Sequence, residues 1–109
     1  MLVLEFVFDK SNKNWHNGDP RCNLLFLRAA EEYFNVKLKN FGRVTLDEIL
    51  NYLCIDIPVG LGFYGWDYEY NKDKEISFGF QDQIKAVSNG EQQFVLLRFN
   101  INTEKEVKT

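Results

Sequence analysis

The chain has 109 residues, of which 45% are hydrophobic and 16% aromatic, and its formal net charge is −3. This composition is typical of a packed globular domain and excludes a disordered chain, and no apolar stretch approaches the roughly 20 residues that would cross a membrane. Residues 55–109 carry the acidic excess, with six basic and nine acidic side chains, which argues against a surface that neutralises the phosphates of a nucleic acid.

The beginning of the chain predicts a strand, a polar loop and the start of a helix. Residues 2–8 alternate in the period of a strand, whereas residues 9–18 are rich in Asn and Lys and have no apolar period. Asp19 followed by Pro20 is a strong helix start, because Asp accepts hydrogen bonds from the free amides of the first turn and Pro has no amide to leave unbonded.

The helix that begins at Pro20 is expected to run to about Asn35 with one buried apolar stripe. The stripe consists of residues spaced three or four apart: Cys22, Leu25, Phe26, Ala29, Ala30, Tyr33 and Phe34. Residues 36–44 either extend this helix or contain a turn at 40–42 and a short strand around 41–44. We expect the turn and the strand.

A second helix is predicted after Thr45. Thr45 and Glu48 fit a capping box, in which each side chain satisfies a backbone amide at the helix start. The buried stripe of this helix would be Leu46, Ile49, Leu50 and Leu53, and the helix should end before Pro58, since the residue preceding a proline avoids helical geometry.

The second half of the chain predicts two hairpins. Residues 63–70 and 76–80 alternate around a polar turn, and Asn89-Gly90 is a tight-turn signal between residues 84–87 and 93–102. In the last strand Val95, Leu97, Phe99 and Ile101 face one way, whereas Phe94 and Leu96 face the other. Apolar residues on both faces at its start are typical of a central strand. We therefore expect one α+β domain over residues 1–102, an antiparallel sheet of four to five strands packed against two helices, with a frayed polar tail at 103–109.

A row of aromatic residues lies on one face of the first predicted hairpin: Tyr64, Trp66, Tyr68 and Tyr70. Three interpretations are open, which are packing under the helices, contact with a protein, and stacking of unpaired bases. We expect packing, because the neighbours in sequence are Asp67 and Glu69 rather than Lys or Arg.

The sequence predicts no catalytic residues. His16 is the single histidine and lies in a loop without a motif, and Cys22 and Cys54 are expected to be buried thiols on helices. A pair of Cys22 with His16, in which the helix start lowers the pKa of the thiol, is the alternative.

No metal or cofactor is predicted either. Three Cys and His residues are too few for a structural zinc site. Oxygen ligands recur at every second residue across one turn, at Asp67, Glu69, Asn71, Asp73 and Glu75. Their spacing resembles a calcium loop, but Lys72 stands where such a loop needs Gly, so we expect a solvated hairpin face.

Two features are candidates for partner binding. Trp15 lies in a polar loop, where it either staples the loop to the core or stands exposed as an interface anchor. The acidic turn is the second candidate. The predicted partner-binding residues are Trp15, His16, Asp67, Glu69, Asp73 and Glu75.

Four runs of residues carry a resemblance to a known family: Thr-Leu-Asp-Glu-Ile-Leu at 45–50, Gly65-Trp66 followed by Tyr68, Ile-Ser-Phe-Gly-Phe at 76–80, and Leu-Leu-Arg-Phe-Asn at 96–100. They resemble a family of small proteins of unknown function carried by phages and other mobile elements of Gram-positive bacteria. The runs are mostly fold-making, so the resemblance implies a genomic setting more than an activity.

In that setting the resemblance implies a non-enzymatic protein-interaction module that acts in the host cytoplasm. Its partner would be a host or phage protein, and the module would inhibit a host defence nuclease, in the manner of an anti-CRISPR, or a regulatory complex. An accessory structural or assembly protein of the phage particle is the alternative, and a small enzyme is the third. No membrane or nucleic-acid partner is expected, and the oligomeric state stays open.

Overall fold

A computed structural model describes residues 4–69 and 74–101 of the chain. The elements follow in the order β1 (Glu5–Phe8), α1 (Pro20–Phe41), β2 (Arg43–Thr45), α2 (Leu46–Leu53), β3 (Gly65–Asp67), a short 3₁₀ turn η1 (Gln81–Gln83), α3 (Ile84–Ser88) and β4 (Val95–Arg98). In the described ranges no helix is long and apolar enough to cross a membrane. The α+β class is confirmed.

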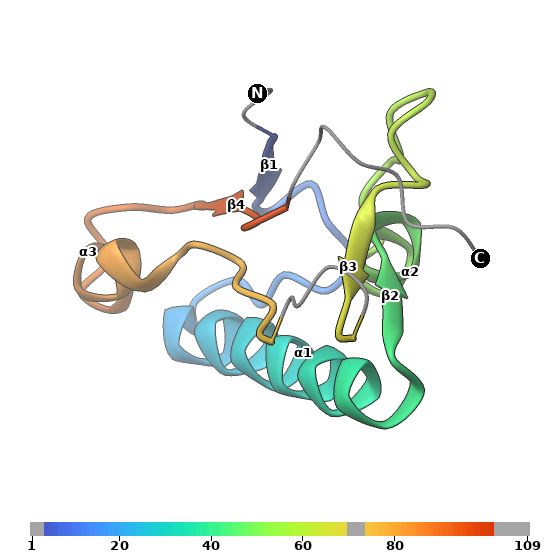
Figure 1. Cartoon of the computed structure of the whole chain (residues 1–109). Helices are drawn as coiled ribbons and strands as arrows, with labels where there is room; N and C mark the ends of the chain where they lie inside the picture. The colour runs from blue at the N-terminus through green and yellow to red at the C-terminus, as the bar shows by residue number, and fades with distance from the viewer. Residues whose placement is uncertain (1–3, 70–73, 102–109) are drawn as a thin grey trace.

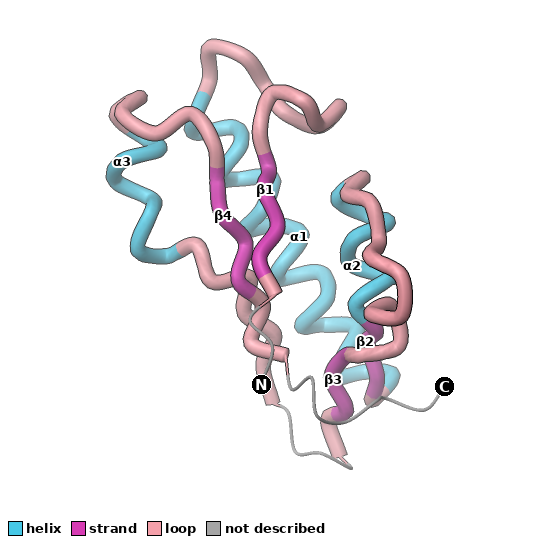
Figure 2. The backbone as a smooth tube through the Cα atoms, turned by 90° about the horizontal axis from the view of Figure 1, so that it is seen from above, coloured by secondary structure: helices cyan, strands magenta, loops and turns pink. Residues whose placement is uncertain are grey.

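Helix α1 is the base on which the rest of the molecule is built. Both sheets lie on the same side of it, with β1 and β4 over one part and β2, β3 and α2 over the other (Figures 1 and 2). Strand β1 pairs with β4 and β2 pairs with β3, each antiparallel, and the two pairs do not join. The predicted single sheet of four to five strands is therefore wrong.

The start of α1 is as predicted, but its end is not. Asp19 caps the helix by accepting from the Cys22 amide at 3.2 Å, and Pro20 occupies the first turn. The helix then continues past Asn35 to Gly42, whose positive φ of 82° and amide bond to the Leu38 carbonyl end it. Residues 36–41 therefore extend the helix, because Leu38 continues the buried stripe, and the predicted short strand follows Gly42 as β2.

The buried stripe of α1 is rotated from the predicted one. It consists of Asn23, Leu24, Leu27, Ala30, Phe34 and Leu38. Leu25, Ala29 and Tyr33, which were assigned to the core, are exposed. Periodicity missed this because α1 carries apolar residues on both faces, so the spacing alone cannot tell which face meets the sheets.

Helix α2 forms as the sequence predicts. The Thr45 amide donates to Oε2 of Glu48 at 2.7 Å, and both halves of the capping box are present. The four apolar residues that were expected to face the core, Leu46, Ile49, Leu50 and Leu53, are all fully buried.

Neither predicted hairpin forms. Residues 65–67 pair with 43–45, so Trp66 lies opposite Val44 instead of opposite a residue of 76–80. This close pairing needs a glycine, because a Cβ at Gly65 would lie 2.1 Å from the Val44 carbonyl oxygen. Residues 84–88 form α3, and the Asn89-Gly90 signal ends that helix in place of a hairpin turn.

Strand β4 has one strand partner and a second edge that is satisfied by other groups. The side chain of Gln83 bonds both the amide and the carbonyl of Leu96, at 2.8 Å each. Further along, the Arg98 amide donates to the Phe78 carbonyl at 2.8 Å. The predicted central strand is thus flanked on one side by β1 and on the other by irregular chain, while Val95 and Leu97 face the core as expected.

Residues 75–79 belong to no sheet, and α1 holds one side of them. Oδ1 of Asn35 accepts from the Ile76 amide at 2.6 Å, and its Nδ2 donates to the Ile76 carbonyl at 2.9 Å. One turn earlier, Glu31 accepts from the Phe78 amide at 2.9 Å. Ile76 and Phe78 are consequently turned into the core, where both are fully buried.

Asn100 holds the other side of the same segment. Its Oδ1 accepts from the Ser77 amide at 2.7 Å, and its Nδ2 donates to the Glu75 carbonyl at 2.9 Å. The indole Nε1–H of Trp66 also donates to Asn100. Asn100 therefore links the segment to both sheets, since it follows β4 and contacts β3.

Gly79 should be the least replaceable glycine in this arrangement. It has a φ of 70°, and a Cβ there would lie 2.1 Å from the Arg98 carbonyl oxygen. We expect Gly79→Ala to lower the free energy of unfolding by about 2–4 kcal/mol, since left-handed strain and a backbone clash add.

Gly90→Ala is the matched control, because Gly90 has a φ of 84° but open space around it. It should cost only about 1–2 kcal/mol, the left-handed strain alone. Urea unfolding measures the free energy of unfolding of both variants. Equal decreases in the two variants would contradict a backbone clash at position 79.

Candidate functional site

Trp15 staples its loop to the core. The ring is half-buried and meets Phe8 edge-on, with 5.5 Å between centroids. The sequence left two roles open for Trp15, a staple to the core and an exposed interface anchor. In the structure the ring packs against the core. A part for Trp15 in binding a partner stays a prediction.

His16 is exposed and is positioned through its backbone. Its amide donates to Oδ1 of Asn23 at 2.7 Å, and its carbonyl accepts from Nδ2 of Asn23 at 3.1 Å. Asn23 is fully buried on α1 and thus fixes the loop against the first turns of the helix. No sequence signal points to Asn23, because a single polar residue inside an apolar stripe belongs to no motif.

The acidic candidates lie near the end of β3. Asp67 forms an ion pair with Arg43 at 3.8 Å and accepts from the Glu69 amide at 3.1 Å. Glu69 and Glu75 are exposed. Asp73 and the predicted ligand Asn71 lie outside the described residues. A partner-binding role for this set stays a prediction.

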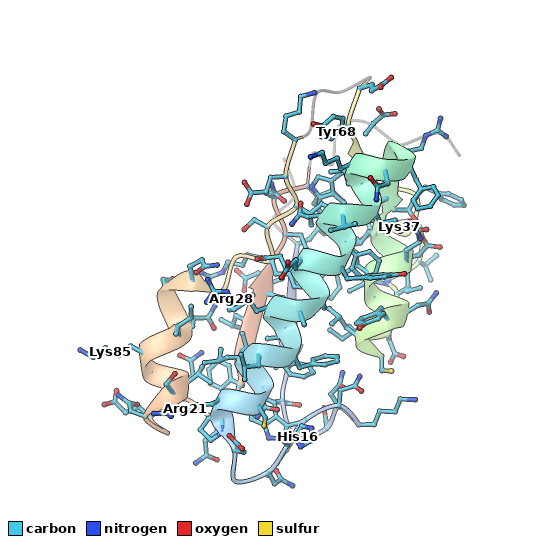
Figure 3. All side chains as sticks on the ribbon, turned by 90° about the horizontal axis from the view of Figure 1, so that it is seen from below. His16, Arg21, Arg28, Lys37, Tyr68 and Lys85 are labelled. Carbon is cyan, nitrogen blue, oxygen red and sulfur yellow. The ribbon has the colours of Figure 1, made fainter. Side chains whose placement is uncertain are left out.

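The two predicted groups are at opposite ends of α1. Asn23 holds His16 at the first turns, whereas the Tyr68 amide bonds the carbonyl of Gly42, which ends the helix. Figure 3 shows His16 and Tyr68 beside opposite ends of the ribbon. A helix of 22 residues spans about 33 Å. The structure therefore does not bring His16 together with Asp67 and Glu69, which a small enzyme would need.

The two cysteines are more accessible than predicted. Cys22 is half-buried and Cys54 is exposed, and both are free. The thiol of Cys22 donates to Oδ2 of Asp19 at 3.1 Å, and this bond to the helix cap raises the pKa of the thiol. The effect is opposite to the activation that the alternative pair of Cys22 and His16 requires.

Cys54 should therefore be alkylated faster than Cys22 at neutral pH, because the thiolate is the reactive form. Asp19→Ser keeps a capping oxygen but removes the carboxylate, so it should raise the rate at Cys22 severalfold. Mass spectrometry after timed iodoacetamide treatment measures both sites in one sample, with Cys54 as the internal control. Equal rates in the unmodified protein would contradict the bond.

The outer face of α1 carries an apolar stripe that no described element crosses (Figure 3). Leu25 is 65% exposed, Tyr33 52% and Val36 53%, and Ala29 lies exposed between them. Leu25 and Val36 are 11 residues apart, about 16 Å along the helix. We call these four residues the outer stripe of α1.

Stacked aromatic rings connect the outer stripe to the core. Tyr33 stacks on Tyr52 of α2 at 5.5 Å between centroids, Tyr52 stacks on Phe26 at 6.2 Å, and Phe26 stacks on Phe8 at 5.6 Å. Tyr52 is itself 45% exposed. The row widens the apolar surface across the boundary between α1 and α2 and fixes the orientation of its rings.

Charged residues border the outer stripe on both sides. On the side of α2, Lys37 forms an ion pair with Glu48 at 2.6 Å. The other side carries Arg21, Arg28, Glu32 and Lys39, which recur at the spacing of one helix row. In Figure 3, Arg21 and Arg28 lie on one side of the α1 ribbon and Lys37 on the other.

Glu48 connects this border to the capping box. Burial opposes the ionisation of Glu48, but the bonds from Lys37 and from the Thr45 amide outweigh it, so the pKa of Glu48 lies below its ordinary value. The same pair raises the pKa of Lys37. Both shifts favour the charged pair at neutral pH.

Because the pKa of Glu48 is lowered in the folded protein, part of the free energy of unfolding depends on pH. Because the folded-state pKa is lowered, the stabilisation is present above the ordinary pKa of Glu, about 4.3, and is lost as the pH falls through the lowered value. We expect Glu48→Gln to lower the free energy of unfolding by about 1 kcal/mol at pH 7. The variant should also lose less of its free energy of unfolding than the unmodified protein when the pH falls from neutral to acid.

Glu91→Gln, at an exposed position beyond α3, is the control for the loss of one carboxylate. Urea unfolding over a pH series compares the two variants with the unmodified protein. If the free energy of unfolding of Glu48→Gln falls in acid as much as that of the unmodified protein, the role of this carboxylate is contradicted.

A groove of about 570 Å³ lies between the charged row of α1 and Tyr68. Its charged lining residues are of both signs: Arg28, Lys39, Lys74, Glu31, Glu32 and Glu75. The ammonium of Lys74 also lies 4.1 Å from the centre of the Tyr68 ring. This mixture gives the groove no clear preference for a cationic or an anionic ligand.

Within residues 4–69 and 74–101, no group of three or more His, Cys, Asp or Glu residues is placed to hold a metal ion. The predicted carboxylate ladder is only partly inside these ranges. The outer stripe of α1, where exposed apolar residues follow one helix face, is the candidate site that we consider further. The sequence signal for the outer stripe is the number of apolar residues in α1, which is larger than one buried stripe can hold.

The sequence profile of a family of unknown function, DUF6353, matches residues 3–107 of the chain. No curated protein and no solved structure matches.

Proposed function

The chain belongs to DUF6353, a family of unknown function, and we propose that it is a non-enzymatic protein-binding module that holds its partner on the outer stripe of α1. The observation that carries this proposal is the exposure of Leu25, Tyr33 and Val36 on one uncovered helix face. Contiguous apolar surface of this kind is costly in water and marks interaction sites in soluble domains.

The stacking of Tyr33 on Tyr52 supports the same surface. Exposed aromatic rings that are already held in one orientation lose little conformational entropy when a partner covers them, and Tyr is enriched among the residues that dominate interfaces. The phage setting, with a host or phage protein as the partner and inhibition of a host defence nuclease as the outcome, stays a prediction from the resemblance. An assembly role in the particle is the alternative.

Photo-crosslinking in the native cell tests the proposal. A photoreactive phenylalanine analogue at position 25 should give a discrete protein adduct, whereas the same analogue at the fully exposed Val59 should not. Ala29→Glu places a charge in the middle of the stripe and should abolish the adduct without changing the circular dichroism spectrum. Adducts that are equal at both positions, or absent at position 25, would refute the proposal.

A further inference from the structure

The outer stripe of α1 has two properties that together specify its occupant. It is apolar along a straight helix, and one border is charged in a defined order. A helix face with these properties can pair with a second copy of itself only if a single twofold axis matches both the apolar and the charged residues. The spacing along α1 provides that test.

The apolar residues define one axis. In an antiparallel pair of α1 helices, Leu25 of each copy meets Val36 of the other when the twofold axis crosses near position 30.5, the mean of the two numbers. This is also the midpoint of α1, which runs from Pro20 to Phe41. Ala29 lies next to the axis, and its small side chain allows the two backbones to approach closely.

The charged row defines the same axis independently. Arg28 of each copy lies opposite Glu32 of the other when the axis crosses position 30, half a residue from the axis of the apolar pairing. The two pairings therefore differ by one residue in register, about 1.5 Å along the helix. A twofold axis perpendicular to both helices brings identical borders together, so the two groups face each other. Among the described residues, neither Arg28 nor Glu32 takes part in an ion pair.

We propose that the partner on the outer stripe is a second copy of this chain, with the two α1 helices packed antiparallel about an axis near position 30. This inference rests on the proposed function, because it names the occupant of the same surface. Two symmetric contacts between Arg28 and Glu32 border an apolar centre made of Leu25, Ala29 and Val36.

The same register predicts a weakness at the ends of the contact. Arg21 of each copy lies opposite Lys39 of the other, within about one residue, and these like charges repel. The dimer should therefore be of moderate affinity, and Arg21→Glu should tighten it.

Charge exchange tests the register. Sedimentation equilibrium of the full chain should show a reversible dimer, and Arg28→Glu or Glu32→Arg alone should raise its dissociation constant by about tenfold, since two attractive contacts become repulsive. The double variant, Arg28→Glu with Glu32→Arg, should restore the original value. Lys85→Glu on α3 is the control for a change of net charge and should leave the dimer unchanged.

Three outcomes would overturn the second copy as the partner. These are a monomer at concentrations up to about 1 mM, a dimer that Ala29→Glu does not weaken, and a double variant as weak as the single ones. The crosslinks at position 25 separate this failure from failure of the proposed function. An adduct with a different protein from a monomeric chain refutes the dimer but keeps the binding surface, whereas no adduct and no dimer refute both.

Discussion

Three polar side chains hold residues 75–79 between α1 and the end of β4, and the relative positions of both sheets depend on them. Asn35 and Glu31 bond the segment from the helix, and Asn100 bonds it from the other side. Each bond contributes about 1 kcal/mol, but a buried backbone amide without its partner costs about 1–3 kcal/mol. The segment therefore keeps its place although it belongs to neither sheet, and Ile76 and Phe78 contribute to the core.

This arrangement explains why the outer face of α1 is free. The bonds from Glu31 and Asn35, together with the buried stripe, all reach the side of the helix that faces the sheets. The molecule thus has one layer of irregular and strand structure on one side of one long helix (Figure 1). No element of residues 4–69 and 74–101 forms a second layer over the outer stripe, and this open face is the physical basis of the proposed function.

Four runs of residues, 45–50, 65–68, 76–80 and 96–100, lie around the same constraint. Gly65 allows β3 to approach β2, and Trp66 donates to Asn100 at the end of the last run. Residues 76–80 are the held segment itself. These runs specify the fold, whereas the outer stripe of α1 lies outside all of them.

The sequence alone determined the elements whose signals are local. Asp19-Pro20 fixed the start of α1, the Thr45 and Glu48 box fixed the start of α2, and alternation placed Val95 and Leu97 in the core. In each case the physical cause acts within a few residues, so it can be read without knowing the rest of the fold.

Only the tertiary structure decided what pairs with what. Residues 63–70 and 76–80 have the pattern of a hairpin, but the long-range bonds from Asn35 and Asn100 separate them. Helix α1 has apolar residues on two faces, and contact with the sheets selected the face of Leu27 and Leu38, leaving Leu25 exposed. Such choices depend on which distant surfaces compete for one segment, and local periodicity carries no information about that competition.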